Sequence, residues 1–304
     1  MTEEFLKLNQ CLEALEQNKA LEEEANFLGR VEAIEFINFQ LLDQLEARLA
    51  NRPPAEPLRK LTKRAEALQA RLEERNEQFF QTLRLKIKSG AYSPELFRDH
   101  LSQHARDSSQ SEFQDDIGYD ELDILINGLL GLEFSAVETE DRDPEMVFYQ
   151  PTPVRVVLEL IDKAKIGEQD VFYDLGSGLG LVPLLVNLLS GARAKGVEVE
   201  PAYHVYARQN ASSLNLPKVE FINTDARYTN YSDGTIFFMY TPFKGRMLET
   251  VLERLRLEAQ KRGIKVCTYG PCTSQVSRMN WLRCIYQNGN DEESKLAIFV
   301  SIKA

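Results

Sequence analysis

The sequence predicts an all-α N-terminal domain followed by an α/β domain with a doubly wound, mostly parallel sheet. Two observations support this fold class. In the first part of the chain, apolar residues recur at helical spacing with Glu and Gln between them. In the second part, short apolar runs typical of buried strands alternate with helical patterns, which indicates a parallel sheet covered by helices. We therefore expect two domains, residues 1–140 and 141–304.

Charge limits the class of partner. The 304-residue chain has a net charge of −11. Residues 1–140 hold 28 acidic side chains against 16 Lys and Arg, whereas residues 141–304 hold 19 against 20. Neither part is basic enough to follow a nucleic-acid backbone unaided, so we do not expect a nucleic-acid partner.

The sequence also indicates a compartment. No apolar run approaches the length of a membrane span, and the acidic N-terminus lacks the basic and apolar regions of a secretion signal. The four cysteines are too few for a disulfide framework. We therefore expect a reduced, cytoplasmic protein without a membrane partner.

Helical patterns cover most of the N-terminal domain. The predicted helices comprise residues 3–50, 58–88, 93–106 and 119–132. Prolines within residues 52–57 separate the first two, and Ser93 followed by Pro94 is typical of an N-cap with proline at the first helical position. We interpret the charged faces as solvated, while one apolar stripe is a candidate contact for a protein partner or a second copy of the chain.

The C-terminal domain alternates strands and helices, after an acidic linker at residues 138–145. The predicted strands begin at residue 171 and continue with 194–199, 218–222, 235–240, 265–269, 281–286 and 296–302. The predicted helices comprise residues 154–164, 181–189, 201–214 and 245–262, the last with Gly263 as its C-cap. The final two strands form a terminal pair around a turn at residues 288–291.

A glycine-rich turn connects the first of these strands to the next helix. In Asp174-Leu175-Gly176-Ser177-Gly178-Leu179-Gly180, an acid precedes three alternating glycines. Strand, glycine turn and helix form the geometry in which a nucleotide-like ligand meets backbone N–H groups, and side chains there would hold the ligand away. The third glycine comes one residue too early for the nicotinamide fingerprint, and no Gly-Lys-Ser/Thr of a phosphate loop follows.

This stretch resembles motif I of the class I S-adenosylmethionine-dependent methyltransferases, and the resemblance covers about the last half of the chain. It implies a seven-stranded sheet that ends in an antiparallel pair, with S-adenosylmethionine as the cofactor. Together with Gly196-Val197-Glu198, the stretch also resembles the non-SET histone lysine methyltransferases, which place a helical domain before the catalytic fold. We do not extend this second resemblance to histone as the substrate.

The resemblance assigns residues to the parts of the cofactor. Asp174 would face the amino-acid end, and Glu198, or Glu200 as a competing candidate, would hold both ribose hydroxyls. Asp225 and Ala226 would contact the adenine. A turn cap is the alternative role for Asp174, and a local turn is the alternative for Asp225. Tyr203 and His204 lie near the ribose by sequence, and of the two interpretations we favour a solvated helix start for both. The expected cofactor-binding residues are Tyr149, Thr152, Asp174, Gly176, Ser177, Gly178, Gly180, Glu198, Asp225 and Ala226.

The segment around Tyr149 and Thr152 has two interpretations. An aromatic residue followed by Thr-Pro before a helix resembles the segment that closes over the methionine end of the cofactor in many of these methyltransferases. A plain extended linker capped by proline fits the pattern equally well.

The fourth strand ends at motif IV, where substrate meets cofactor. The residues there, all expected to contact the substrate, are Tyr240, Thr241, Pro242 and Phe243. They resemble a variant of the Asn/Asp-Pro-Pro-aromatic motif of amino-group methyltransferases, in which the first side chain and a backbone carbonyl accept hydrogen bonds from the target nitrogen. Tyr240 replaces the Asn or Asp, a departure from the pattern for planar amides and base amines. A strand-end turn with a structural proline is the alternative.

The predicted function is methyl transfer from S-adenosylmethionine to an unidentified acceptor, a protein or a small molecule. The alternative is a non-catalytic S-adenosylmethionine-binding scaffold whose helical domain is the interaction surface, and a nicotinamide oxidoreductase would rest on the glycines alone. We expect no metal, because His100 and His104 lie four residues apart without a third ligand. Cys267 and Cys272 lack a redox or zinc spacing and are interpreted as free thiols.

Overall fold

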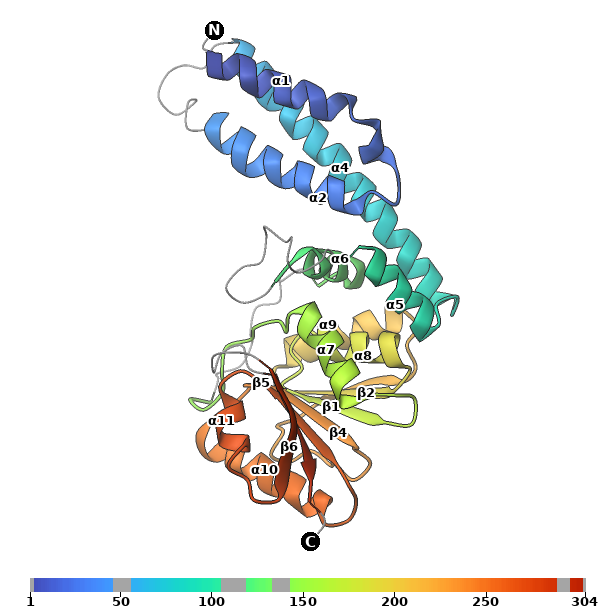
Figure 1. The fold of residues 1–304 in the computed structure, drawn as a ribbon, viewed down its shortest axis with the longest axis vertical. Helices are drawn as coiled ribbons and strands as arrows, with labels where there is room; N and C mark the ends of the chain where they lie inside the picture. Colours follow the sequence, from blue (N-terminus) through green and yellow to red (C-terminus); the bar gives the residue numbers. More distant parts are fainter. Residues whose placement is uncertain (1–2, 46–55, 105–118, 133–142, 289–295, 303–304) are drawn as a thin grey trace. The chain divides into compact units, whose positions relative to one another are not determined.

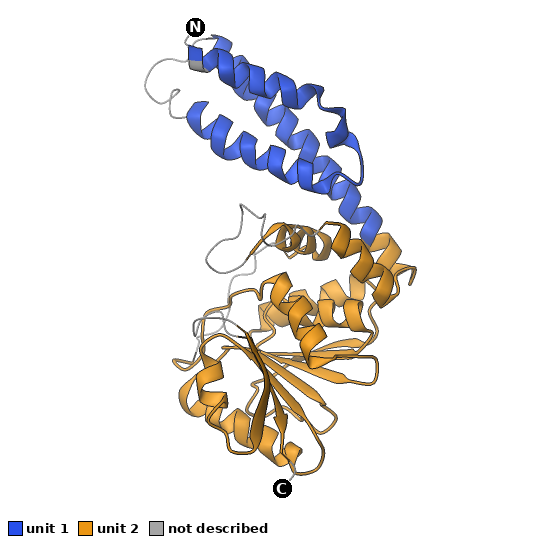
Figure 2. Cartoon of the chain, viewed as in Figure 1, with its two compact units in different colours: residues 1–83 blue, residues 84–304 orange. Residues whose placement is uncertain are grey.

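The computed structural model describes residues 3–45, 56–104, 119–132, 143–288 and 296–302 (Figure 1). The chain divides into two compact units, residues 1–83 and 84–304 (Figure 2). This division falls earlier than the predicted domain boundary near residue 140, which itself lies outside the described residues. Most of the linker at 138–145 and most of the turn at 288–291 also lie outside them.

The first unit packs helical segments around one apolar core. Its elements are α1 (Glu3–Gln17), the 3-10 helix η1 (Lys19–Glu22), α2 (Phe27–Glu35), the π-helical η2 (Phe36–Leu42) and most of α4 (Glu56–Lys88). Leucines and isoleucines at helical spacing, such as Leu12, Ile37 and Leu72, are fully buried there.

The helical pattern predicted from residue 3 to about 50 is interrupted in the structure. Asn18 and Asn26 cause the interruption, because their side chains accept hydrogen bonds from the backbone of Ala20 and Gly29. Each Asn is therefore the N-cap of a new helix. Apolar spacing alone does not distinguish one long helix from two capped ones.

A buried arginine connects the parts of this unit. The Arg30 side chain is 1% exposed. Its guanidinium donates to the Asn76 side chain at 2.7 Å and to the carbonyl oxygen of Glu23 at 2.5 Å, with further bonds to Leu21 and Glu24. Because the charge has several acceptors, its burial stabilises one arrangement of η1, α2 and α4.

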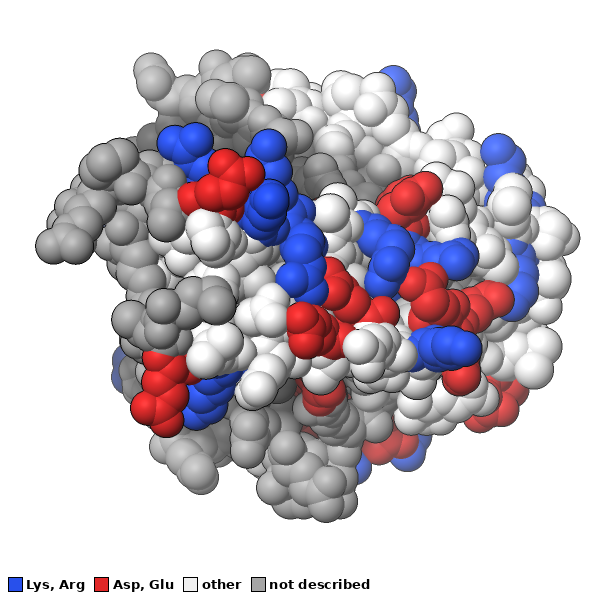
Figure 3. Space-filling model, turned by 90° about the horizontal axis from the view of Figure 1, so that it is seen from above, with Lys and Arg blue, Asp and Glu red and all other residues white. Residues whose placement is uncertain are grey.

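Charged side chains of the first unit form exposed ion pairs. Arg71 and Arg75 contact Glu22, and Lys60 contacts Glu56. On the face of the molecule drawn in Figure 3, basic and acidic side chains are interspersed, without one broad patch of either sign. Exposed pairs of this kind contribute little to stability, which agrees with their interpretation as solvated faces.

The second unit contains a seven-stranded sheet in the order β3-β2-β1-β4-β5-β7-β6. The strands are β1 (Val171–Leu175), β2 (Arg193–Glu198), β3 (Val219–Asn223), β4 (Ile236–Tyr240), β5 (Lys265–Tyr269), β6 (Leu282–Asn288) and β7 (Leu296–Ser301). β1 to β5 are parallel, whereas β7 pairs antiparallel with both β5 and β6. The predicted doubly wound class I methyltransferase sheet with a terminal antiparallel pair is confirmed.

Helices cover both faces of the sheet (Figure 1). On one face lie α7 (Val154–Ala164), α8 (Leu181–Ser190) and α9 (Pro201–Ser213), and on the other α10 (Gly245–Ala259) and α11 (Cys272–Val276). Two further helices do not cover the sheet itself: α5 (Pro94–Gln103) packs on α8, and α6 (Glu121–Leu130) packs on α7. Successive residues of β1 point to opposite faces of the sheet. Tyr173 and Leu175 point to the face covered by α10, because they belong to the core cluster that includes the apolar side of that helix. None of the helices within the described ranges is long and apolar enough to cross a membrane.

Two helix predictions differ from the structure. α10 ends at Ala259 with Gln260 as its C-cap, so the prediction of Gly263 as C-cap is wrong. The chain leaves the helix earlier because Arg262 turns inward and donates to the carbonyl oxygens of Tyr231 and Gly234. The five-residue α11 was not predicted, since so short an element has no measurable period.

We expect Arg30→Ala to destabilise the first unit by roughly 2–4 kcal/mol, because the buried Asn76 side chain and the carbonyl groups of the η1 segment lose a charged donor. Denaturant unfolding followed by circular dichroism measures this change. Arg59→Ala, at an exposed site on α4, is the control and should shift stability by less than about 0.5 kcal/mol. Equal stability of the Arg30 variant and the wild type would contradict the assigned role.

Candidate functional site

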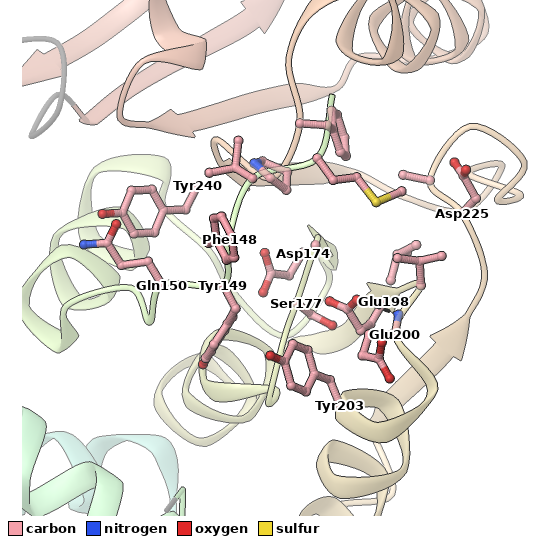
Figure 4. Close-up of a pocket in the computed structure, with 18 of the residues that line it drawn as sticks. Phe148, Tyr149, Gln150, Asp174, Ser177, Glu198, Glu200, Tyr203, Asp225 and Tyr240 are labelled. Atoms are coloured by element: carbon pink, nitrogen blue, oxygen red, sulfur yellow. Dashed lines mark hydrogen bonds between the residues drawn. The ribbon is translucent and has the colours of Figure 1, made fainter. Parts of the chain in front are cut away.

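A pocket lies at the carboxyl ends of the parallel strands, beside β1, where the strand order reverses. Open α/β sheets bind ligands at this position. Figure 4 shows how the labelled side chains are arranged along the pocket. Tyr240 and Gln150 lie at one end, Asp225 lies at the other, and Asp174, Ser177 and Glu198 lie between them. The pocket is therefore long enough to present different chemistry to different parts of one ligand.

The glycine turn forms the floor of this pocket. Gly176, Gly178 and Gly180 have φ values of +84°, +52° and +90°, which side chains rarely tolerate. Space is restricted as well, because a Cβ on Gly176 would lie 2.3 Å from Pro242 and one on Gly180 would lie 2.6 Å from the Phe221 ring. Gly176 itself lines the pocket, whereas Gly178 and Gly180 shape the turn from outside the lining.

Two polar groups in the floor lack hydrogen-bond partners among the described residues. The Ser177 hydroxyl belongs to a side chain that is 4% exposed, and it has no partner there. Asp174 is equally buried, and its carboxylate accepts no hydrogen bond in the same part of the structure. Buried polar groups are normally paired, so both indicate a polar ligand at this point.

Two carboxyl groups, those of Asp174 and Glu198, are buried in the pocket. Burial, reinforced by the nearby Glu198, raises the pKa of Asp174 well above its usual range. Burial also raises the pKa of Glu198, although backbone N–H groups oppose this effect. Glu198 accepts hydrogen bonds from the backbone of Gly178 and of Glu200, both at 2.8 Å. A cationic ligand group near Asp174 would offset the cost of its ionisation.

Glu200 and Tyr203 lie beside Glu198. Glu200 is the N-cap of α9 and accepts from Ala202 N at 3.0 Å, so part of its carboxylate is engaged within the helix. The expectation that Tyr203 is solvated is wrong, because its side chain is 4% exposed and lines the pocket. The ring lies 5.5 Å from that of Tyr149, between centroids, and this packing accounts for its burial.

Residues 145–154, here called the strap, pass along the open side of the pocket. Tyr149 packs its ring on the glycine turn, where a Cβ on Gly178 would lie 2.0 Å from the ring. Burial raises the pKa of Tyr149, so its hydroxyl stays protonated. Thr152 is buried in the lining, whereas Phe148 is 78% exposed at its edge. The strap therefore contributes side chains to the pocket.

Asp225 and Ala226 line the pocket at the end of β3, as the sequence placed them. The Asp225 carboxylate accepts from the backbone of Arg227 at 2.7 Å and forms a two-pronged ion pair with its guanidinium. Asp225 thus makes the local turn that was the alternative interpretation, while still facing the pocket.

Motif IV contributes three of its four expected residues to the pocket: Tyr240, Pro242 and Phe243. Thr241 does not line it. Its backbone has a positive φ of +39°, and its hydroxyl bonds to Tyr269 O and Cys272 N, both at 3.1 Å. These bonds connect the end of β4 to α11. The Tyr240 ring packs against Tyr269 with centroids 4.7 Å apart.

Several lining residues escaped the sequence analysis. They include Phe148, Gln150, Thr224 and Met247. Only position relative to the predicted strand ends was available as a signal, and Phe148 and Gln150 flank the predicted Tyr149. No group of three His, Cys, Asp or Glu side chains in the described ranges is placed to hold a metal, and His104 is buried as the C-cap of α5.

Comparison with known proteins gives one family match. The family model described as histone methylation protein DOT1 matches residues 146–266, which include the strap except for Glu145, the glycine turn and motif IV. No curated protein shows a significant match.

Solved structures of methyltransferases resemble the second half of the chain. An RNA methyltransferase from Salinibacter ruber in complex with S-adenosyl-L-homocysteine is 24% identical over 51% of this chain and 95% of its own, with a TM-score of 0.41. A ribosomal protein L11 methylase from Lactobacillus delbrueckii is 15% identical over 53% and 84%, with a TM-score of 0.41. A precorrin-6y C5,15-methyltransferase from Geobacter metallireducens is 17% identical over 53% and 96%, with a TM-score of 0.39.

At neutral pH we expect Asp174→Asn to make the ligand-free protein more stable than the wild type. Because the folded state raises the pKa of Asp174 above its ordinary value of 3.8, the folded protein binds that proton more tightly than the unfolded chain. Its contribution to stability is therefore complete below about pH 4 and is lost as the pH rises through the folded-state pKa. Thermal unfolding of both proteins from about pH 4 to pH 8 should show a difference that grows with pH.

Asp162→Asn is the matched control for this experiment. Lys163 and Lys165 donate to the exposed Asp162 carboxylate and lower its pKa, so its removal should not stabilise the protein. An Asp174 variant that is no more stable than the wild type at neutral pH would mean that the carboxylate is already compensated.

Proposed function

Because residues 146–266 belong to the class I S-adenosylmethionine-dependent methyltransferases, we propose that the protein methylates an amine on a protein acceptor. S-adenosylmethionine, the cofactor of the family, supplies an electrophilic methyl group on a sulfonium. The pocket fits this molecule, since the unpaired Ser177 hydroxyl and the buried Asp174 carboxylate offer bonds to its polar, cationic amino-acid end. In this proposal Glu198 holds the ribose hydroxyls, and Asp225 with Ala226 contacts the adenine.

The single observation that carries the proposal is the charge of the pocket. Its lining contains five acids, namely Asp143, Asp174, Glu198, Glu200 and Asp225, and no Lys or Arg among the residues that the structure describes. Arg227, which does not line the pocket, forms ion pairs with Asp143 and Asp225, so the lining acids that it does not pair, in the described part of the chain, are Asp174, Glu198 and Glu200. Such a lining favours a cationic donor and an acceptor that arrives as an ammonium group. It opposes phosphate groups, which supports a protein or amine acceptor over a nucleic acid.

The acceptor would enter at the end of the pocket that holds Phe148, Gln150 and Tyr240 (Figure 4). Aromatic rings there offer faces on which an alkylammonium group packs favourably. The family match to a histone methylation protein supports a protein side chain as the source of this amine. The alternative, a non-catalytic S-adenosylmethionine-binding scaffold, follows from the absence of Asn or Asp at position 240.

We expect micromolar binding of S-adenosylmethionine by the wild type, and binding weakened at least about 30-fold in Asp174→Ala and in Glu198→Ala, because each removes a buried charged partner of the ligand. Calorimetric titration measures both. Glu220→Ala, which changes an exposed acid on β3, is the control and should bind normally. A folded wild type that does not bind would contradict the proposal.

We expect Tyr240→Ala to bind S-adenosylmethionine within about twofold of the wild type but to transfer methyl groups at least tenfold more slowly, because the wall that aligns the acceptor is lost. Transfer of labelled methyl groups to the proteins of a cell lysate is the measurement. Transfer only to the small-molecule fraction would change the acceptor class. Tight binding of the cofactor with no transfer to either fraction would favour the scaffold.

A further inference from the structure

We propose that Glu145 and Asp123 are positioning residues that hold the strap against the cofactor pocket from its two ends. This inference rests on the proposed function, because it assigns both residues a part in binding S-adenosylmethionine. Neither residue lines the pocket, and each acts through a helix start that it caps.

The first anchor is the Glu145 carboxylate at the start of α10. Its two oxygens accept from Arg246 N at 3.1 Å and Met247 N at 2.8 Å. The Glu145 carbonyl oxygen accepts from Lys244 N at 2.9 Å. α10 has no capping side chain of its own, because its N-cap residue is Lys244. Glu145 therefore supplies the cap from outside the helix and joins the strap to it.

This anchor joins the strap to motif IV. Val147 N donates to Pro242 O at 3.0 Å, and Met146 forms an antiparallel bridge with Phe243. Gly245 leaves room for the Glu145 carboxylate, because a Cβ at this position would lie 2.4 Å from Glu145 Oε1. The start of the strap and the loop after β4 are therefore held together by backbone hydrogen bonds.

The second anchor is the Asp123 carboxylate in the first turn of α6. It accepts from Val154 N, the first residue of α7, at 2.9 Å, and from Asp120 N at 2.8 Å. α7 begins after Pro153, which offers no capping side chain. Close by, the Tyr119 hydroxyl donates to Pro151 O at 2.5 Å. The end of the strap is thus fixed to α6 and its N-cap turn.

Between the anchors, the strap places Tyr149 on the glycine turn and Thr152 in the lining. A segment fixed at both ends has fewer conformations than one fixed at a single end. Cofactor binding must order whatever remains free, so each anchor lowers the entropic cost of binding. Loss of an anchor should therefore weaken cofactor binding while leaving the chemistry of the bound complex unchanged.

The experiment is calorimetric titration of the full chain with S-adenosylmethionine, paired with labelled methyl transfer at saturating cofactor. We expect Glu145→Ala and Asp123→Ala each to raise Kd about tenfold and to leave the saturated transfer rate within about twofold. Glu145→Gln keeps an oxygen that accepts from a backbone N–H, and it should recover most of the affinity.

Ser93→Ala is the matched control, because it removes the N-cap of α5, which accepts from Leu96 N, at a similar cost in stability. Its Kd should equal that of the wild type. Folded Glu145→Ala protein with wild-type Kd, or a control that binds as weakly as the anchor variants, would overturn the inference while the proposed function stands. A wild type that does not bind S-adenosylmethionine would overturn both.

Discussion

The lack of space for side chains at the glycine turn is the constraint on which the pocket depends. Three separate parts of the chain converge there: the motif IV loop at Gly176, the strap at Gly178 and β3 at Gly180. Because each neighbour lies where a Cβ would stand, the turn brings them closer together than any other residue would permit. The same turn directs the Gly178 N–H at Glu198, which fixes that carboxylate beside the ligand.

Burial of acids at this turn lowers the stability of the ligand-free protein and favours the binding of a cationic ligand. Glu198 is compensated by two backbone donors, so its ionisation is partly supported by the protein itself. Asp174 has no such support among the described residues, and its raised pKa reflects burial first and Glu198 second. A cationic cofactor end would supply the missing partner, so the site is arranged for a ligand that the free protein needs for electrostatic balance.

The sheet was predictable from sequence because buried parallel strands such as β4 are apolar runs bounded by turn residues. Glu198 was predictable because spacing places it at a strand end next to the glycines. Tyr203 was not, since only the packing of Tyr149 across the turn buries its ring. Thr241 lies outside the lining for a related reason: the chain has a positive φ there, its hydroxyl bonds to Tyr269 and Cys272, and no periodicity encodes that turn. Contacts between loops distant in sequence decide such details.

The geometry of motif IV bears on how an amine would react. Internal hydrogen bonds of Thr241 fix the loop, so its shape does not depend on an acceptor. What remains at the acceptor end is the Tyr240 ring, supported by Tyr269, with Phe148 at the edge. On the proposed function, an amine must lose its proton before it attacks. That proton passes to solvent water before the attack. Exclusion of water by the aromatic walls favours its release, whereas the acidic lining and the ring faces that attract the ammonium group oppose it. On the same proposal, alignment of the acceptor against the Tyr240 ring contributes to the rate through proximity.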